Sequence, residues 1–593
     1  MPTRFRGAIS CGLALVLGLS SAAWPATAPA DLVVLNGKVL TVDAAFRVAE
    51  AAAIRDGVFV LVGTNEQART LVGAHTRVVD AGGRTVIPGL IDSHVHALGV
   101  AESEARGAFR DLRTIAEILA FVREKAAAVP DGQWVFSPRV FPTRVAERRL
   151  PTRAELDEAA PRHPVVVDAA YAFMVNSAAL KAAGIGPDTP SPPGGAIVKD
   201  GQGAPTGLLR NVGGLLDRYR AAGRPEELLP ALEEVHRRYN EVGITSVIER
   251  AADLAGYRAY AQLHAQGRQR VRATVTLRVD SDGTVEGTEA FIRSLGLRFG
   301  DGDDRLRVGP LKVFADGGIL AGTAFMREPY GPAAASLYGV ADPSYRGFLT
   351  IPADKIRNIM RTGHRLGWQM CAHVTGDAGV DAVLDAFEAA DADRSIRDRR
   401  FTLIHAYFPT PDVARRAAAL GVAVDTQPAW YYKDADALLP ALGEARLRPF
   451  LGLAEWLRAG VKVVLNTDHM FGVDPDHSLN PYNPFLTLAT AVTRRTEGGQ
   501  VIGPEEAISR EDALRMMTTN AAWLSFEESR KGSIEVGKLG DLVVLSDDYL
   551  ACPPGRIKQI RAVVTVLGGT VVYEAQGRRA AAGPPRPRRR TFP

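Results

Sequence analysis

The sequence predicts an α/β protein: a (β/α)8 TIM-like barrel with insertions, joined to a small discontinuous β-sandwich domain formed from both chain ends. Three observations lead to this fold. The 593 residues suffice for three or four domains of about 150 residues, or for one large barrel with an accessory domain. Apolar runs of strand length alternate with helical stretches through the middle of the chain. Short β-branched strands separated by glycine-containing turns occur at both ends.

The β-sandwich is expected in two pieces. Residues 31–86 contain DLVVLNGKVLTVD and AAAIRDGVFVLVG, where Asn-Gly and Asp-Gly turns separate the strands. Residues 526–577 contain GDLVVLSDD and IRAVVTVLGGTVVYEAQG, with a Gly-Gly turn. Because both segments show the same hairpin signals, we expect them to form one domain.

The barrel is expected over residues 87–525. Its strands are predicted in the runs PGLIDSHVH, PVVVDAA, GITSVIER, VRATVTLRVD, LRVGPLKVFAD, GWQMCAHVTGD, FTLIHAYF, GVAVDTQPAW and VKVVLNTDHM. In the predicted helix after GWQMCAHVTGD, Val380, Val383, Leu384 and Phe387 form one buried stripe. An open doubly wound sheet is the alternative, but neither a GxGxxG nor a GxxxxGK[ST] loop follows any of these runs.

The chain ends carry different signals. Residues 1–30 combine early arginines, an apolar run and a small-residue region, which is the layout of a secretory signal peptide. We therefore expect export to the periplasm or the medium, with no stable membrane insertion after signal removal. Only Cys371 and Cys552 remain after cleavage, too few for a disulfide-built fold, although one bridge stays open as a possibility. Residues 578–593 are rich in proline and arginine and are expected to be a disordered basic tail.

Charge excludes one class of partner. The formal net charge is +4, but without six arginines of the tail and two near the start it becomes −4. A nucleic-acid partner therefore has no electrostatic support, and we expect a small-molecule substrate.

Four histidines and one aspartate stand where apolar strands give way to polar residues. His94 and His96 are two positions apart on one strand, so both imidazoles face the same side. In a barrel, that side is the interior at the carboxyl end, where catalytic groups lie. His373, His405 and Asp468 end later strands in the same way. Nitrogen and oxygen donors in this number are typical of zinc and similar divalent ions, so we predict a divalent metal site with zinc as the first choice.

Lys312 lies inside another apolar strand, where an unpaired charged lysine is costly to bury. Two interpretations remain open. The ammonium group is paired with Asp316 or another carboxylate, or the neutral amine has captured carbon dioxide and become a carbamate that bridges two metals.

Taken jointly, these motifs resemble those of the amidohydrolase superfamily, and within it the amidohydrolase family 3 branch, which includes N-substituted formamide deformylases. The resemblance spans nearly the whole mature chain and depends on PGLIDSHVH, PTRAELD, VNSAALKAAGI, PTGLLR, LKVFADGG, HVTGDAGVDAVLDAFE, IHA, NTDHM, AVTRRT and GSIEVGKLGDLVVL. It implies a metal-dependent hydrolase on a distorted barrel. It also implies metal and catalytic roles for His94, His96, Lys312, His373, His405 and Asp468.

The chain departs from the family pattern at three places. Tyr171 stands where many relatives have a histidine, Ile404 precedes His405 where glutamate is common, and Thr467 replaces the serine before Asp468. The changes at residues 404 and 467 spare the ligands but alter the groups that orient them, whereas the change at residue 171 concerns substrate contacts. Tyr171, Trp430 and His469 are predicted to contact substrate, although core packing is the alternative explanation for Trp430.

The resulting hypothesis is hydrolysis of an amide or another non-peptide C–N bond by a metal-activated hydroxide, with Asp468 as general base and then acid. A mononuclear deaminase or cyclic-amide hydrolase is one alternative, with one metal rather than two per chain. A catalytically silent exported binding protein on the same barrel is the other. The sequence does not specify the substrate, the metal, the oligomeric state or the signal cleavage site.

Overall fold

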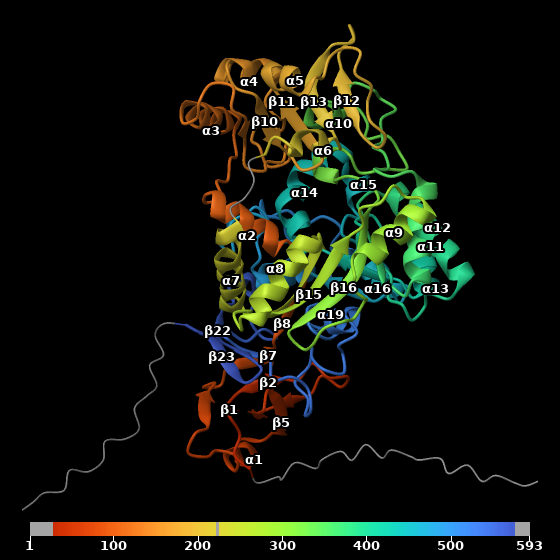
Figure 1. The fold of residues 1–593 in the computed structure, drawn as a ribbon. Coiled ribbons are helices and arrows are strands. Elements are labelled where there is room, and N and C mark those ends of the chain that lie inside the picture. Colours follow the sequence, from red (N-terminus) through yellow and green to blue (C-terminus); the bar gives the residue numbers. More distant parts are fainter. Residues whose placement is uncertain (1–27, 221–224, 576–593) are drawn as a thin grey trace, which may run out of the picture.

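A computed structural model describes residues 28–220 and 225–575 of the chain (Figure 1). The first 27 residues of the expected signal segment and the whole expected basic tail lie outside the described residues.

The centre of the molecule is an eight-stranded, all-parallel sheet with the order β20-β19-β18-β17-β16-β15-β14-β8. Its first and last strands approach each other through a parallel bridge between Val95 and His469, so the sheet is nearly closed. This confirms the predicted α/β barrel. The strands are β8 (Leu90–Val95), β14 (Ile244–Ala252), β15 (Arg272–Arg278), β16 (Leu306–Phe314), β17 (Met370–Val374), β18 (Thr402–His405), β19 (Ala423–Thr426) and β20 (Val463–Leu465).

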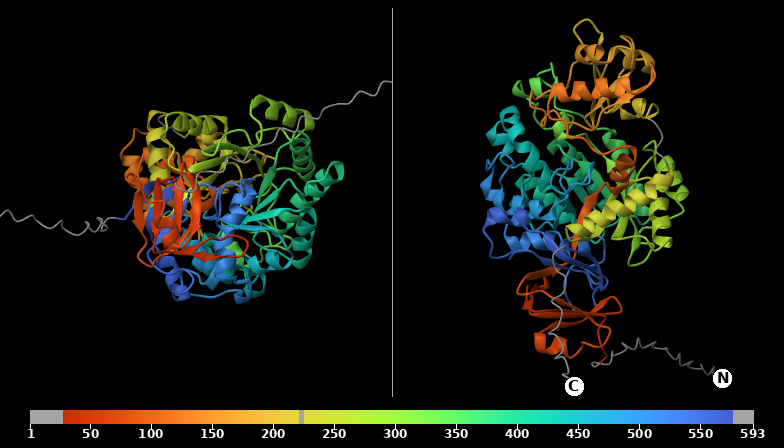
Figure 2. Two further views of the ribbon diagram at one scale, coloured as in Figure 1. Left: turned by 90° about the horizontal axis from the view of Figure 1, so that it is seen from below. Right: turned by 90° about the vertical axis from the view of Figure 1, so that its left-hand side faces the viewer.

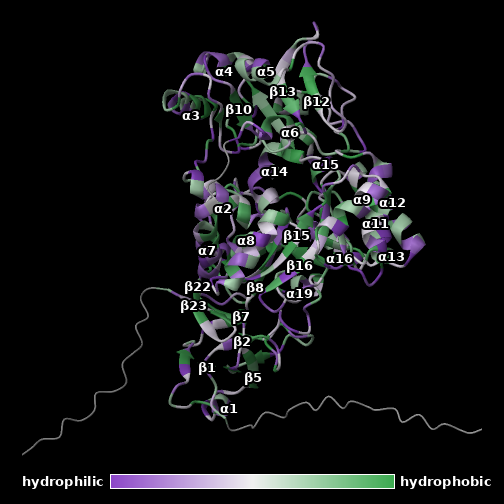
Figure 3. Ribbon diagram, viewed as in Figure 1, coloured by the Kyte–Doolittle hydropathy of each residue, from purple (hydrophilic) through white to green (hydrophobic). Residues whose placement is uncertain are grey.

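Helices surround this barrel and bury one face against it. In α12 (Asp377–Asp393), the stripe of Val380, Val383, Leu384 and Phe387 is fully buried, as its spacing predicts. The barrel strands are coloured as hydrophobic in Figure 3, whereas the helices alternate between hydrophobic and hydrophilic residues. The other helices around the barrel are α2 (Ala97–Arg106), α7 (Pro225–Glu241), α8 (Leu254–Ala265), α9 (Val285–Ser294), α10 (Ala333–Tyr338), α11 (Ala353–Arg365), α13 (Pro411–Leu420), α14 (Pro428–Leu442), α15 (Glu444–Leu447), α16 (Leu453–Arg458), α17 (Pro484–Thr493), α18 (Arg510–Met516) and α19 (Thr519–Leu524).

The chain ends form two further sheets, the first from the amino-terminal segment alone and the second from both ends. One has the order β5-β4-β1-β6, and the other has the order β23-β22-β21-β7-β2-β3. The antiparallel pairing of β7 with β21 joins the early segment to the late one. Their elements are β1 (Leu32–Leu35), β2 (Lys38–Leu40), β3 (Val48–Ala49), β4 (Ala51–Arg55), β5 (Val58–Gly63), α1 (Asn65–Arg69), β6 (Arg77–Asp80), β7 (Thr85–Pro88), β21 (Leu542–Leu545), β22 (Ala562–Leu567) and β23 (Thr570–Glu574).

A buried ion pair connects this sandwich to the barrel. The guanidinium of Arg272, on β15, donates from Nε and Nη2 to the two carboxylate oxygens of Asp541 at 2.7 and 2.9 Å. Asp541 directly precedes β21, and both side chains are buried. The pair therefore fixes the sandwich against the amino-terminal end of a barrel strand.

A five-stranded sheet with the order β12-β13-β11-β10-β9 is inserted between β8 and β14. The run PVVVDAA forms β10 of this sheet, so its assignment to the barrel was wrong. It pairs with β9 in parallel and with β11 through an antiparallel hairpin, and a strand of the all-parallel barrel does not make the hairpin contact. The inserted elements are α3 (Ile115–Ala127), β9 (Val135–Phe136), α4 (Arg153–Ala159), β10 (Val165–Asp168), β11 (Ala172–Val175), α5 (Ser177–Ala183), β12 (Ala196–Lys199), β13 (Pro205–Arg210) and α6 (Gly213–Asp217).

The inserted sheet lies beyond one end of the barrel and the sandwich lies beyond the other (Figures 1 and 2). Cys371 and Cys552 are both buried and free, so they do not form the disulfide left open by the sequence. Within residues 28–220 and 225–575, no helix has the length and apolar character needed to span a bilayer.

Candidate metal and active site

His94 and His96 converge at the carboxyl end of β8. Their Nε2 atoms are 3.3 Å apart, because His94 ends the inward face of the strand and His96 follows at the start of α2. Burial lowers the pKa of both imidazoles, and for His94 the nearby Lys312 charge adds to this effect. Both rings are therefore neutral near pH 7, the state in which an imidazole nitrogen offers a lone pair to a metal.

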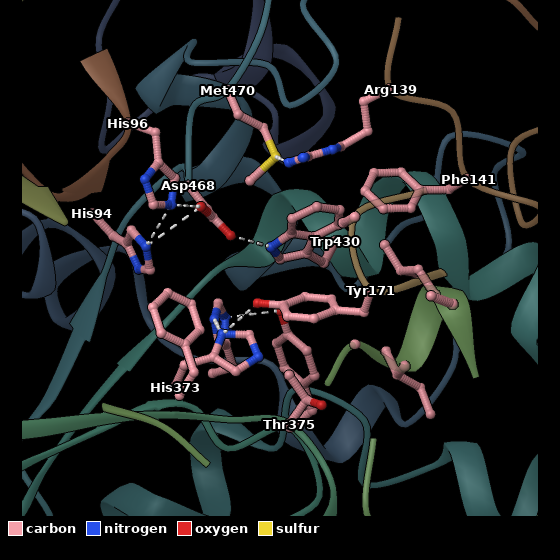
Figure 4. A pocket seen from close by; sticks show the side chains of 18 of the residues that line it. His94, His96, Arg139, Phe141, Tyr171, His373, Thr375, Trp430, Asp468 and Met470 are labelled. Atoms are coloured by element: carbon pink, nitrogen blue, oxygen red, sulfur yellow. Dashed lines mark hydrogen bonds and ion pairs between the residues drawn. The ribbon is translucent and has the colours of Figure 1, made fainter. Parts of the chain in front are cut away.

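Asp468 follows β20 and completes this cluster (Figure 4). Its Oδ1 lies 3.5 Å from Nε2 of His94 and 3.4 Å from Nε2 of His96. Oδ1 is buried and accepts no hydrogen bond from the described residues. One donor atom from each of the three residues fits within 4.8 Å. An unpartnered carboxylate oxygen beside two neutral imidazoles is a donor set that suits a divalent cation.

His373 and His405 form a second imidazole pair. Nε2 of His405 is 2.7 Å from Nδ1 of His373, and the ring centroid of His405 is 5.5 Å from that of His94. Nδ1 of His405 lies 2.6 Å from Oε1 of Gln427, which only accepts, so Nδ1 carries the proton and Nε2 has the lone pair. Burial lowers the pKa of His373 to about 3 and that of His405 well below its ordinary value.

Lys312 lies between the two imidazole pairs. Its Nζ donates to Nε2 of His94 at 3.4 Å and stands over the Phe314 ring at 4.8 Å. No carboxylate of the described residues lies within ion-pair distance of this ammonium group. Asp316, the predicted partner, instead accepts the backbone N–H groups of residues 325, 375 and 376. Burial lowers the pKa of Lys312 to about 8, which makes the neutral amine accessible near neutrality.

These residues open into a cavity of about 360 Å³. Aromatic side chains form part of its wall, and Tyr171 and Trp430 both line it. The Trp430 indole N–H donates to Oδ2 of Asp468 at 2.9 Å, so this ring orients the carboxylate as well as forming a wall. The Tyr171 hydroxyl is 3.4 Å from Nδ1 of His373. The wall also includes the side chains of Phe141, Phe314, Tyr407, Phe471, Met470 and Arg139.

The profile of the amidohydrolase family matches residues 77–573. The chain belongs to this family. It is 31% identical to the N-substituted formamide deformylase of Arthrobacter pascens over 566 residues, which cover 92% of this chain and 99% of that protein. It is 28% identical to Protein LONG AFTER FAR-RED 3 of Arabidopsis thaliana over 578 residues, 94% of each chain. A solved metal-dependent hydrolase from Pyrococcus horikoshii OT3, uncharacterized in function, has a similar fold. It aligns with a TM-score of 0.65 and 22% identity over 88% of this chain and 99% of its own.

The barrel, the buried donor set and the family together make this amidohydrolase a metal-dependent hydrolase of carbon–nitrogen bonds. The structure places His94, His373 and His405 at the carboxyl ends of barrel strands, as the hydrophobic runs of the sequence predict.

A buried charged network supports the strands that carry the candidate metal donors of this amidohydrolase. This network was not predicted from the sequence. The buried carboxylate of Asp425 accepts from Ser93 Oγ at 2.6 Å, Asn466 Nδ2 at 2.6 Å and Arg250 Nη2 at 2.7 Å. It thereby ties β8, β14, β19 and the end of β20 together. A signal was present, since Arg250 and Asp425 are charged residues inside apolar strand runs.

The structure shows what the residues that depart from the family pattern, and the neighbouring His469, contact. The Thr467 hydroxyl donates to Asp92 at 2.6 Å, so threonine still anchors the segment before Asp468. Ile404 is buried and is not part of the cavity wall. His469 is also absent from the wall. Its Nδ1 is 2.8 Å from the Tyr239 hydroxyl and its Nε2 is 2.8 Å from the backbone oxygen of residue 472.

Proposed function

We propose that this amidohydrolase hydrolyses an amide bond of a small molecule, with Asp468 as the group that moves the proton. The observation that carries the proposal is the split role of its two oxygens. Oδ2 is held by Trp430, whereas Oδ1 is open toward the imidazoles of His94 and His96. A carboxylate fixed by one oxygen and free at the other is suited to accept and return a proton.

His94, His96 and Asp468 would hold a divalent cation, and their nitrogen and oxygen donors favour zinc as the first metal to test. When bound, such a cation supplies a Lewis acid that polarises a carbonyl group and lowers the pKa of water to about 7. Because a carboxylate oxygen has two lone pairs, Oδ1 of Asp468 can face the cation and still accept a proton from the attacking water. The same atom then returns the proton to the leaving nitrogen.

The aromatic wall would hold the substrate and keep bulk water out. Trp430 fixes the carboxylate, and the Tyr171 hydroxyl lies close enough to His373 to contact a carbonyl oxygen bound there. A hydroxyl aimed at the position where negative charge develops stabilises the tetrahedral state.

Lys312, His373 and His405 would hold a second cation if the lysine carries a carbamate. The neutral amine adds to carbon dioxide with loss of one proton and gives a carboxylate-like group on Nζ. The absence of a carboxylate partner for Lys312 among the described residues supports this proposal. A mononuclear deaminase or cyclic-amide hydrolase is the second candidate, because only His94, His96 and Asp468 form a compact cluster of His, Cys, Asp or Glu donors in the described chain.

The test combines turnover with metal counting. The protein is prepared without chelator, its metals are measured by elemental analysis, and N-substituted formamides, N-acyl amines and acyl amino acids are offered with zinc or manganese. We expect turnover, and two metals per chain would favour the carbamate over the mononuclear candidate. In Asp468→Asn we expect at least a 1,000-fold loss of turnover, about the upper part of the range for general acid–base catalysis, with metal retained. Wild-type turnover in that variant would exclude Asp468 as the base, and no turnover on any substrate would favour a silent binding protein.

Export remains a further proposal that rests on residues 1–30. Cell fractionation and amino-terminal sequencing of the mature protein would test it, since a cytoplasmic protein with an intact Met1 would exclude it.

A further inference from the structure

Arg139 stands at a neck between two cavities. It lines the cavity of about 360 Å³ that contains His94, His96 and Asp468, called here the metal cavity. It also lines a larger outer cavity of about 1000 Å³ beside the inserted sheet. Gly99, Ala170 and Phe471 line both cavities as well, so the two spaces meet around this arginine. Figure 4 shows the guanidinium beside Met470, above the ring of Trp430.

The guanidinium of Arg139 is only loosely held. Its Nε and Nη2 lie 3.3 and 3.4 Å from the carboxylate of Asp168. That carboxylate is shared, because Arg220 donates to it at 2.6 Å and the backbone N–H of Ala170 at 2.8 Å. The nearest partner recorded for Nη1 is Sδ of Met470 at 4.0 Å, a weak acceptor. Arg139 thus retains N–H groups with no oxygen acceptor among the described residues.

The charge around this position favours an anion. Asp168 is buried and faces two guanidinium groups, so one carboxylate serves two cations. Asp217 is 3.6 Å from Nε of Arg220, but its side chain is 66% exposed, and solvent screens such a pair strongly. The other charged groups that line the metal cavity, Lys312 and Asp468, belong to the site already described.

We propose that Arg139 binds a carboxylate group of the substrate, and that the preferred substrates are therefore anionic amides such as N-acyl amino acids. The inference rests on the hydrolase function proposed above and specifies its substrate class. The two N–H groups of Nη1 and the free N–H of Nη2 would form a forked pair with the carboxylate. The apolar part of the substrate would lie against Phe471, whose ring is 4.9 Å from the guanidinium carbon, and against the aromatic wall.

The partial burial of Arg139 explains why a neutral side chain at this position would bind a carboxylate less tightly. Arg139 is one-quarter exposed, with 24% of its side chain accessible, so it is reached from the cavity but partly shielded from bulk water. A charge-assisted hydrogen bond in such a place changes affinity by about 10- to 150-fold.

The experiment compares substrates that differ only in the carboxylate. N-formylphenylalanine is paired with N-formylphenethylamine, where the charge is on the amine side. N-benzylsuccinamic acid is paired with N-benzylbutanamide, where the charge is on the acyl side. For the wild-type protein we expect kcat/KM to favour the charged member of one pair by about 10-fold or more. In Arg139→Met this preference is expected to be lost, mainly through KM, and Arg139→Lys is expected to recover part of it.

Arg220→Met is the matched control, because Arg220 also binds Asp168 but lines only the outer cavity. We expect this variant to keep the preference. Equal kcat/KM values for the charged and neutral members of each pair would overturn the proposal that Arg139 binds the carboxylate (the anchor) and would leave the hydrolase proposal intact. A charged-to-neutral ratio of kcat/KM that is unchanged in Arg139→Met would do the same. A ratio lost equally in Arg220→Met would likewise overturn it, since disruption around Asp168 would then explain both.

If no substrate is cleaved, the hydrolase proposal fails, and binding still tests the anchor. Calorimetry would compare 3-phenylpropanoate with 3-phenylpropanol on the wild-type protein and Arg139→Met. Tighter binding of the carboxylate that is lost in Arg139→Met supports the anchor, and equal binding of both compounds overturns it.

Discussion

The hydrogen bond from Trp430 to Asp468 yields the sharpest prediction. The substitution Trp430→Phe removes the indole N–H and keeps an aromatic ring in the wall. It leaves Oδ2 of Asp468 without the donor that now stands 2.9 Å away. Both side chains are buried, with 6% and 2% of each residue exposed, so bulk water does not replace the lost donor freely.

The expected magnitude follows from this geometry. A hydrogen bond to a charged group contributes about 1.5–3 kcal/mol, which corresponds to about 10- to 150-fold in rate. Phenylalanine is smaller than tryptophan, so the space it leaves can admit a water molecule that compensates in part. We therefore expect kcat/KM to fall by about 10- to 50-fold.

The assay measures kcat and KM on the best substrate found, with metal content determined in parallel. Phe141→Leu is the matched control, because the Phe141 ring packs edge-on against Trp430 at 5.5 Å and has no hydrogen bond to Asp468. Trp430→Phe should retain metal and lose more activity than Phe141→Leu. If both variants lose activity equally, or if Trp430→Phe stays within two-fold of the wild type, the orienting role of the indole is refuted.

Two further predictions concern the second cation and the link between domains. In Lys312→Met we expect the metal content to fall from two ions per chain to one, as measured by elemental analysis; an unchanged count of two would exclude the bridging carbamate. In Asp541→Asn we expect a destabilisation of about 3 kcal/mol, visible as a lower thermal midpoint, because Arg272 keeps its charge but loses a buried counter-charge. Burial pushes the pKa of Asp541 up, but Arg272 outweighs it and holds the pKa below the ordinary 3.8. The ion pair therefore stabilises the wild type fully above pH 3.8, and this stabilisation is lost as the pH falls through the lowered pKa of Asp541. The wild type and Asp541→Asn should then have similar stabilities at low pH. A difference in stability that persists at low pH would contradict this account.

The barrel and its donor residues could be predicted because they are encoded locally. A barrel strand is a short apolar run, and a candidate site residue shows as a polar residue at the carboxyl end of that run, as with His373 and His405. The spacing of His94 and His96 also fixes their common face. No long-range information is needed for these assignments.

The rest depends on contacts between distant segments. Arg139 follows β9 of the inserted sheet and Asp168 ends β10, and nothing in their local sequence shows that they pair or that Arg139 lies beside Met470. The run containing Asp168 has the same apolar character as a barrel strand, so only its hairpin partner distinguishes it. His469 looked available because it follows Asp468, yet Tyr239, 230 positions away, lies against its ring.

The pairing of β7 with β21 has a consequence for biosynthesis. β7 ends two residues before β8, the strand that carries His94, and its partner residues lie more than 450 positions later, as with Ile87 and Val543. A ribosome delivers one partner long before the other, so the nascent chain holds an open hydrophobic strand edge through most of its translation. The sandwich behind β8 is thus completed only when the last strands have emerged, and a chain cut short near its carboxyl terminus loses β21, the strand that pairs with β7 next to the strand of His94.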